Sequence, residues 1–316
     1  ARAEASADGR PLIEVQHHHA HVASVIAEMA ARGIIGPAEQ VLGIALDGTG
    51  AGTNGTVWGG EVMIASLSGF TRMAHLKPWR LPAGMASVRD ARRNAFSLLH
   101  SCELLNHPGA RVLAEGLSEA ERAVTTTMIE RGLNSPLTSS MGRLLDAMAA
   151  MLGICLNATY EGEPAIMLEA AAWRVLGTDD ARRAHDRADS SDYRFALHEQ
   201  PVSAPDEQTR QRRSRVGEHA IDQVIELDPT PMVRAALDGL SAGRRCESRL
   251  RCLHPDCAPF RHSQCCAFRR CFHEPPALGR GTAAVAGRRP APACPQRGAG
   301  KRWLHRLRAS CRRPCA

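Results

Sequence analysis

The chain has 316 residues, a hydrophobic share of 44% and a formal net charge of +7. This length allows one large domain or two ordinary ones with a sizeable core. No apolar run reaches the about 18 residues of a transmembrane helix, and the first ten residues lack the apolar stretch of a secretory signal. These absences argue against membrane-spanning and secreted proteins, and we expect a cytoplasmic protein.

The charge is distributed unevenly along the chain. Residues 244–316 contain 16 Arg and one Lys against three acidic residues, a net charge of +14, which leaves −7 for residues 1–243. Nine of the 11 cysteines also lie in residues 244–316. The remaining two cysteines predict no disulfide framework for the first part.

After a leading segment, residues 1–13, the motif VQHHHAH opens a helical pattern over about 16–32, which Gly33 ends. His17 and His21 are four residues apart and therefore project from the same helix face. Two imidazoles so placed can chelate one metal ion. Taken alone, such a pair is more often a surface accident than a metal site.

Residues 41–76, VLGIALDGTGAGTNGTVWGGEVMIASLSGFTRMAHL, predict a β-meander, because an apolar run and a glycine-rich turn precede two more apolar segments. The glycines let backbone amides approach a phosphate, and Asp47 after the first strand is placed for a metal or its bound water. The turn lacks the GKS or GKT ending of a P-loop. By itself it favours an ordinary turn.

Further helical patterns follow in the second part of the sequence. They cover about 86–104, 118–132, 140–152, 163–175 and, from a start at Pro231, 228–240. Ser118 and Glu121 have the spacing of a capping box. Asp146 lies one turn after Gly142, where the pattern alone predicts a solvated helix residue. The motif YEGEPAIMLE, residues 160–169, predicts a tight turn into a helix whose N-terminus suits an anion.

Two segments show little periodicity. Residues 178–215 are highly charged and predict a mobile insertion or linker. Residues 244–316 contain no Ile, no Met and a single Val, which is too little apolar surface to offset the entropy of ordering. We therefore predict a disordered, basic, cysteine-rich tail.

Four motifs, in this order, resemble the C-terminal region of the HypF carbamoyltransferases: VQHHHAH, LDGTGAGTNGTVWGGE, TSSMGRLLDAMAAMLG and YEGEPAIMLE. The resemblance spans about 14–243 and implies an α/β fold, part of an actin-like ATPase domain of the ASKHA or Kae1-like type. It also implies the family's role in maturation of the nickel-iron hydrogenase. There, carbamoyl-adenylate is made from carbamoyl phosphate and ATP. Its carbamoyl group passes to the C-terminal cysteine thiol of HypE, and later becomes a cyanide ligand of iron.

The resemblance also implies the site residues. A divalent metal, iron or zinc, is expected at His17, His21 and Asp47, where it acts as a Lewis acid. Asp146 is expected to face the nucleotide ribose, and the turn 161–163 to lie near the adenine and phosphates. The expected nucleotide-binding residues are Gly48, Thr49, Gly50, Gly142, Asp146, Glu161, Gly162 and Glu163. No nucleophile is expected on this chain, because the partner's thiolate attacks.

The sequence departs from the family at both ends. The family's acylphosphatase-like, zinc-finger and adenylate-forming domains are missing upstream, together with the first strands of the transferase domain. Downstream, RRCESRLRCLHPDC replaces an apolar helix and a closing lobe whose Asn-Asp-Gly-Gly motif completes the metal site. We interpret residues 244–316 as the translation of GC-rich DNA in a shifted frame. This interpretation predicts poor solubility and weak metal binding.

Two alternatives belong to other function classes. The related tRNA threonylcarbamoyl transferase ranks lower, because the triple-His run and the WGGE meander favour HypF. A zinc module within residues 252–273, with arginines that bind nucleic acid, is the non-enzyme alternative. Its spacings fit no standard finger, and the adjacent Cys265 and Cys266 suit a tetrahedral site poorly. We therefore do not expect a nucleic-acid partner.

Overall fold

The computed structural model describes residues 9, 12–84, 86–176 and 193–241. Most of the leading segment 1–13, the first part of the charged insertion and the tail 244–316 lie outside the described residues. The strands are β1 Val41–Ala51, β2 Val57–Ala65, β3 Phe70–Leu76, β4 Trp79–Arg80, β5 Leu137–Thr138, β6 Ala196–Pro201 and β7 Gln223–Asp228. The helices are α2 His17–Ala31, α3 Ala86–Arg89, α4 Ala91–Ser101, the 3-10 turn η1 Pro108–Ala110, α5 Arg111–Glu115, α6 Glu119–Arg131, α7 Met141–Met151, α8 Glu163–Leu176, α10 Glu207–Arg215 and α11 Thr230–Ser241.

One mixed sheet contains all seven strands in the described residues, in the order β4-β5-β2-β3-β7-β6, with β1 paired to β2. The predicted meander is confirmed: β1, β2 and β3 are antiparallel neighbours. In β1 the pairing shifts between Leu46 and Gly50, so the glycine-rich turn lies partly inside the strand as a bulge. Asp47 lies within this irregular part of the strand.

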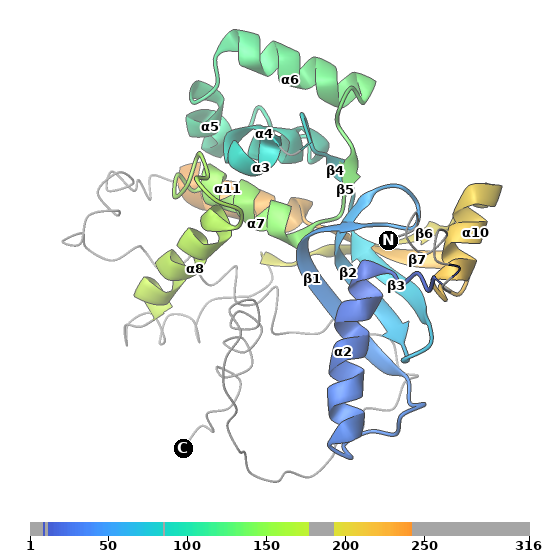
Figure 1. Ribbon diagram of the computed structural model, residues 1–316. Coiled ribbons are helices and arrows are strands. Elements are labelled where there is room, and N and C mark those ends of the chain that lie inside the picture. Colours follow the sequence, from blue (N-terminus) through green and yellow to red (C-terminus); the bar gives the residue numbers. More distant parts are fainter. Residues whose placement is uncertain (1–8, 10–11, 85, 177–192, 242–316) are drawn as a thin grey trace. The chain divides into compact units, whose positions relative to one another are not determined.

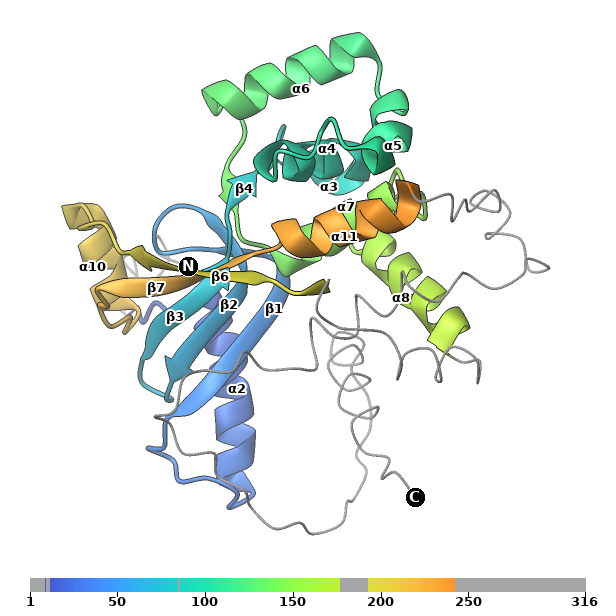
Figure 2. The ribbon, with the colours of Figure 1, turned by 180° about the vertical axis from the view of Figure 1, so that it is seen from behind.

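Helix α2 packs on one face of β1 and β2, as both ribbon views show (Figures 1 and 2). Its apolar residues Val22 and Ile26 join Ala45, Trp58 and other strand residues in a common core cluster. The approach is close at Gly43, where a Cβ atom would lie 2.6 Å from a methyl carbon of Val22. The predicted helix is confirmed, and Gly33 follows it with a positive φ of 66°.

A second group of helices gathers beside the other end of the meander (Figure 1). Helix α7 contacts α4, α8 and both β1 and β2. The predicted helices over 118–132, 140–152, 163–175 and 228–240 are confirmed, including the capping box of Ser118 and Glu121. The helix predicted over 86–104 is two helices, because the Asp90 side chain accepts from the backbone N–H of Arg92 and starts a new one.

The charged insertion needs a correction in its second part. We expected little regular structure in 178–215, yet the structure forms β6 and α10 within 193–215. Strand β6 pairs with β7 along its whole length, from Ala196↔Asp228 to Pro201↔Gln223. Five of its six residues are exposed, and α10 buries none, so neither element carries an apolar pattern. Backbone pairing at the sheet edge holds β6, which hydrophobic periodicity cannot reveal.

Candidate metal and nucleotide site

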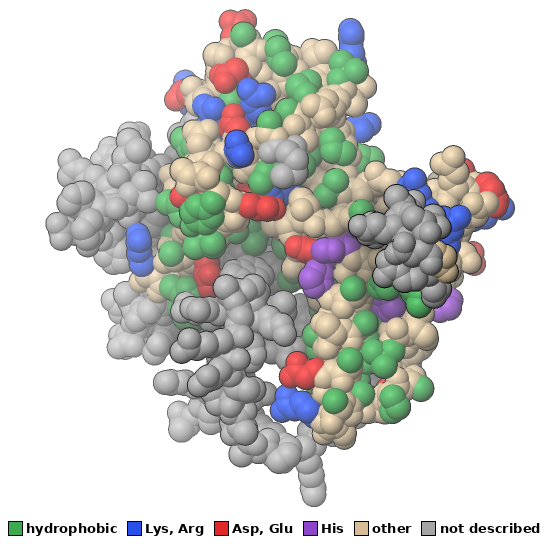
Figure 3. Space-filling view, in the orientation of Figure 1, with side chains coloured by type: hydrophobic (Ala, Val, Ile, Leu, Met, Phe, Trp, Pro, Cys, Tyr) green, Lys and Arg blue, Asp and Glu red, His purple; other side chains and the backbone are tan. Residues whose placement is uncertain are grey.

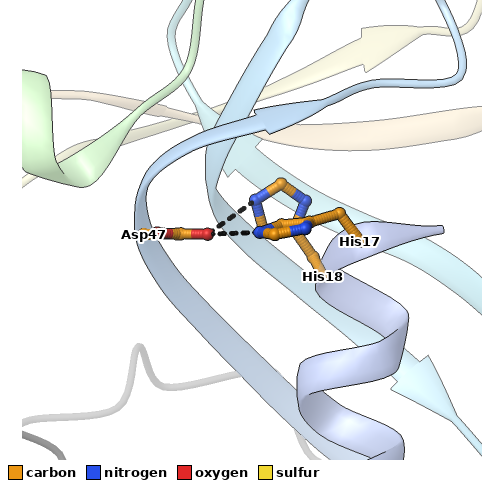
Figure 4. Close-up of side chains that lie close together, drawn as sticks. All are labelled: His17, His18 and Asp47. Carbon is orange, nitrogen blue, oxygen red and sulfur yellow. Dashed lines mark hydrogen bonds and ion pairs between the residues drawn. The ribbon is translucent and has the colours of Figure 1, made fainter. Parts of the chain in front are cut away.

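The first turn of α2 meets the bulge of β1. His17 Nε2 lies 2.8 Å from Asp47 Oδ2. His21 Nε2 lies 3.1 Å from His17 Nε2 and 3.6 Å from Asp47 Oδ2. The structure therefore brings together the three predicted metal-site residues, which come from a helix and a strand. Figure 3 shows histidine side chains gathered at the surface, and Figure 4 shows His17 directed at Asp47.

The separations among these three atoms suit a metal ion. Bonds of about 2.1 Å to nitrogen and oxygen place neighbouring ligand atoms about 3.0 Å apart in an octahedron and about 3.4 Å apart in a tetrahedron. The observed separations of 2.8, 3.1 and 3.6 Å cover this range. The side chains of His17 and His21 are 46% and 60% exposed, so an ion can reach them from solvent. The donors thus fit a divalent metal.

A third histidine lies at this site, and we did not predict it. His18 is fully buried, and its Nε2 atom lies 3.9 Å from Asp47 Oδ2. Burial lowers the pKa of His18 to about 4, so the ring is neutral at physiological pH. His18, Val22 and Ile26 follow one another at four-residue spacing on the buried face of α2. That spacing was visible in the sequence and marked His18 as a buried polar residue.

The remaining histidine of the run has a different environment. The His19 ring stacks on Phe70 with centroids 5.0 Å apart, and its Nε2 atom lies 2.8 Å from the backbone oxygen of Ser66. His19 therefore belongs to the packing between α2 and the sheet. It provides a matched control for its neighbours.

The bulge of β1 presents the predicted glycines to two different neighbours. A Cβ atom on Gly50 would lie 2.7 Å from His17 Cδ2 and would also overlap the His18 ring, so Gly50 makes room for the histidines. A Cβ atom on Gly48 would meet Arg143 Nη2 at 3.3 Å. Thr49 between them is half-buried, and the Gly48 amide donates to Asp47 Oδ1 at 2.6 Å. The bulge thus orients the Asp47 carboxylate.

The start of α7 rests directly on this bulge. A Cβ atom on Gly142 would lie 2.7 Å from the Cα atom of Gly48, so the two glycines allow backbone contact. Ser140, the N-cap of α7, accepts from the amide of Arg143 and donates to the backbone of the bulge, where the Gly48 oxygen lies at 2.5 Å and the Asp47 oxygen at 3.0 Å. This contact joins the helix N-terminus to the strand that carries Asp47.

A buried ion pair supports the same junction from behind. Glu61 on β2 accepts from Ser139 Oγ at 2.6 Å and from the amide of Gly59 at 3.1 Å, and it pairs with Arg72. The Arg72 guanidinium lies over the Trp58 ring, 3.9 Å from its centroid. Burial alone would raise the pKa of Glu61, but Arg72 and these hydrogen bonds lower it below its ordinary value. The WGGE motif therefore builds the frame behind the site.

Asp146 is far more enclosed than a solvated helix residue. Its side chain is 1% exposed and forms an ion pair with Arg143 Nη1 at 3.2 Å. Burial raises the pKa of Asp146 to about 6, against the opposing effect of Arg143. The expectation from the pattern alone, a solvated residue, is corrected, because α7 is buried on nearly all sides.

The turn before α8 lies near the bulge of β1. Glu161 Oε1 would lie 3.8 Å from a Cβ atom on Gly48, and Gly162 has a positive φ of 85°. Glu163 accepts from Thr159 Oγ1 at 2.8 Å and from the Thr159 amide, and these bonds lower the pKa of Glu163. Glu161 therefore faces the bulge, whereas Glu163 closes the turn.

Comparison with known proteins places the chain in a family. Residues 43–270 match the family described as carbamoyltransferase, Kae1-like domain, second subdomain. The chain belongs to this family. The match ends within the basic segment that begins at Arg244. The resemblance inferred from the four motifs is thereby confirmed, together with the α/β, Kae1-like fold.

The relatives are HypF proteins. The chain is 43% identical over 162 residues to the carbamoyltransferase HypF homolog of Cupriavidus necator, and 43% identical over 168 residues to HypF of Rhodobacter capsulatus. These alignments cover 51% and 52% of this chain, but only 39% and 21% of the relatives. The chain thus spans less than half the length of these curated relatives.

Two solved structures share the fold. Full-length HypF in the phosphate- and nucleotide-bound form aligns with a TM-score of 0.56 and 28% identity, over 82% of this chain and 26% of that one. HypF of T. kodakarensis aligns with a TM-score of 0.52 and 26% identity, over 77% of this chain and 27% of that one.

Across the described ranges, no helix combines the length and apolar character needed to cross a membrane.

Proposed function

We propose that this chain carries the carbamoyl-transfer region of a HypF-type enzyme of hydrogenase maturation. In this proposal it binds carbamoyl-adenylate, made from carbamoyl phosphate and ATP. It presents the carbamoyl group to the C-terminal cysteine thiol of a HypE-type partner. The observation that carries the proposal is the open group of His17, His21 and Asp47 beside the glycine-rich bulge.

The residues of the chain divide into two roles in this proposal. His17, His21 and Asp47 hold a divalent ion, iron or zinc, which when bound supplies Lewis-acid polarisation of a phosphate or carbamoyl oxygen. The bulge Gly48-Thr49-Gly50 lies at the N-terminus of α7 near Gly142, where the positive helix end favours a phosphate. The Gly48 amide itself is bonded to Asp47 Oδ1 and orients that carboxylate. The turn 161–163 and the Arg143–Asp146 pair lie at the edge of the proposed nucleotide site.

The test is single-turnover transfer from supplied carbamoyl-adenylate to a HypE-type protein, followed by mass spectrometry of its C-terminal cysteine. We expect His17→Ala and His21→Ala to lower the rate by at least about 100-fold, because metal catalysis is lost. His19→Gln, which alters a histidine of the same run outside the site, should leave the rate within about twofold. Transfer of threonylcarbamoyl from supplied threonylcarbamoyl-adenylate to tRNA, without transfer of carbamoyl to the thiol, would support the threonylcarbamoyl alternative.

The tail is the subject of a separate proposal. We propose that residues 244–316 are read in a shifted frame, because they contain no Ile, no Met and a single Val, while arginine and cysteine accumulate. Resequencing the gene across codons 235–250 decides this. An apolar helix and an Asn-Asp-Gly-Gly motif in another frame would support the shift. Their absence from all frames would leave a genuine tail, and would favour the zinc or nucleic-acid alternative.

A further inference from the structure

The orientation of one buried amide is fixed by its hydrogen bonds. Gln16, the N-cap of α2, is 3% exposed, and its Oε1 atom accepts from the His19 amide at 2.8 Å. Its Nε2 atom therefore faces the backbone oxygen of Ala51 at 3.2 Å and the His18 Nδ1 atom at 3.1 Å. A rotated amide would place its NH₂ group against the His19 N–H and its oxygen against the Ala51 oxygen. Both contacts would be repulsive.

This orientation determines where the proton of His18 lies. An amide NH₂ group only donates, so the Nδ1 atom of His18 must accept. A neutral imidazole carries one proton, which must then be on Nε2. A protonated Nε2 atom has no lone pair for a metal. His18 therefore cannot serve as a ligand through the nitrogen that points into the site, although His17, His18 and Asp47 lie close enough together to suggest a metal site of these three.

The Nε2–H group of His18 is a buried hydrogen-bond donor. Within the described part of the chain it has no hydrogen-bond partner. Asp47 Oδ2 lies 3.9 Å away, so a shift of about 1 Å would produce an ordinary hydrogen bond. Without a metal, His17 Nε2 donates a hydrogen bond to that oxygen at 2.8 Å. When the lone pair of His17 is given to a metal, this nitrogen can no longer donate to Asp47.

We propose that His18 is a positioning residue, held by Gln16 in its Nε2–H form, that donates to the Asp47 carboxylate when His17, His21 and Asp47 hold the ion. The proposal rests on the metal site proposed above. It replaces the simple expectation that adjacent histidines share the metal. In its place, one histidine of the run supports the carboxylate ligand from the buried side, and a glutamine that begins the helix selects the required tautomer.

The first experiment measures the tautomer directly in the full chain. Long-range ¹H–¹⁵N correlation spectra should show His18 with its proton on Nε2, both before and after one equivalent of Zn²⁺. His17 and His21 should change to metal-bound nitrogen shifts. Loss of the Nε2 proton of His18 on addition of Zn²⁺ would overturn the proposal, as would an Nδ1–H form in the metal-free chain.

The second experiment measures affinity for Zn²⁺ by calorimetry and the visible absorption of bound Co²⁺. His17→Ala and His21→Ala should weaken binding by at least about 100-fold, and His18→Gln by about 10-fold with the ligand-field bands of Co²⁺ retained. His19→Gln, the matched buried control, should change neither. Unchanged affinity in His18→Gln would overturn its positioning role. A loss as large as that of His17→Ala would make His18 a ligand and overturn the proposal.

The third experiment changes the residue that sets the tautomer of His18. Gln16→Glu retains the oxygen that accepts from the His19 amide and replaces the NH₂ group with a second oxygen. This oxygen loses the bond to the Ala51 oxygen and is repelled by it, which weakens the cap, but as an ionised acceptor beside His18 it should draw the His18 proton to Nδ1. Nε2 then gains a lone pair, and the Co²⁺ bands should shift as His18 becomes an additional ligand. Unshifted bands would count against the tautomer argument. If the wild-type chain binds neither Zn²⁺ nor Co²⁺, the metal site itself fails and this inference with it, whereas binding that His18→Gln abolishes contradicts the inference alone.

Discussion

Gly142 and Gly48 touch through their backbones, and this contact leaves no room for a side chain. We expect Gly142→Ala to destabilise the fold by about 1–3 kcal/mol, because the added methyl would lie 2.7 Å from the Gly48 Cα atom and must push α7 away from β1. Urea denaturation measures the change. Gly36→Ala is the control, since its nearest neighbour lies 3.9 Å away. Equal effects of the two substitutions would contradict the close approach.

Glu61 is the residue on which the frame behind the site depends. Glu61→Gln removes a buried charge from Arg72, whose guanidinium is then left unpaired in the interior, and we expect a loss of about 3–5 kcal/mol. Glu28→Gln breaks the exposed pair with Arg32 and should cost less than about 1 kcal/mol. Thermal unfolding of the two variants gives the comparison. A small effect of Glu61→Gln would mean that Arg72 finds water or another acceptor.

At the scale of elements, two serines cap two helices, one buried against the bulge of β1 and one exposed to solvent. Ser140→Ala removes the N-cap of α7 and the bond to the Asp47 backbone oxygen, and Ser118→Ala removes the N-cap of α6. Each should destabilise the chain by about 1 kcal/mol. Only Ser140→Ala should also weaken Zn²⁺ binding, because it frees the strand that carries Asp47. Calorimetry on both variants separates stability from site geometry.

Most elements that sequence reasoning located have a buried stripe. The meander and the helices α2, α7, α8 and α11 carry apolar residues at the spacing of their secondary structure, so the pattern identifies them. Helix α6 buries only Thr125 and Ile129, and its capping box marks its start. Strand β6 and helix α10 bury almost nothing and were missed for that reason. The split between α3 and α4 depends on one side-chain hydrogen bond of Asp90, which periodicity does not register.

The site divides along the same line. His17, His21 and Asp47 were found because motif spacing identified them, and the fold brings them together. The role of His18 depends on the orientation of the Gln16 amide, and that of Glu61 on a partner 11 residues away on the next strand. Such information arises only from contacts in three dimensions. Sequence therefore predicted the groups that we propose as ligands, but not those that hold them in place.

At the scale of the whole molecule, Asp146 makes stability depend on pH. Because burial raises its pKa to about 6 from 3.8, the folded state holds a proton between these values that the unfolded state has released. The contribution of Asp146 to stability therefore falls as the pH rises from about 4 to about 6. Asp146→Asn removes this fall, so the free energy of unfolding of the variant should gain on the wild type by about 2–3 kcal/mol over this interval.

His75 provides the control of opposite sign. Burial lowers the pKa of His75 to about 4 from 6.5, so between these two pH values the unfolded state binds a proton that the folded state does not bind. Its contribution is complete above about 6.5 and is lost as the pH falls to about 4. His75→Gln should therefore gain on the wild type as the pH falls. Urea titrations at half-unit pH steps test both variants. For each variant, the difference in the free energy of unfolding from the wild type is plotted against pH, and slopes of the same sign for the two variants would contradict the assignments.

The sheet also has an exposed apolar margin. Within the described residues β1 pairs only with β2, and Leu42 and Ile44 on β1 are 55% and 60% exposed. We expect Leu42→Lys with Ile44→Lys to reduce self-association, because charged residues protect a strand edge from further pairing. Light scattering against concentration measures the effect. Val124→Lys with Leu133→Lys, which are exposed residues outside the sheet, control for added charge. An equal improvement in both would mean that charge alone acts.

The meeting of His17 with Asp47 joins residues 30 positions apart in the chain. An ion held there would cross-link the first turn of α2 to β1 and, by mass action, would stabilise only the folded arrangement of the two. A chelator would then remove this cross-link and lower the stability of the contact between α2 and β1. The unfolding temperature of the chain would therefore rise with the free metal concentration around the protein.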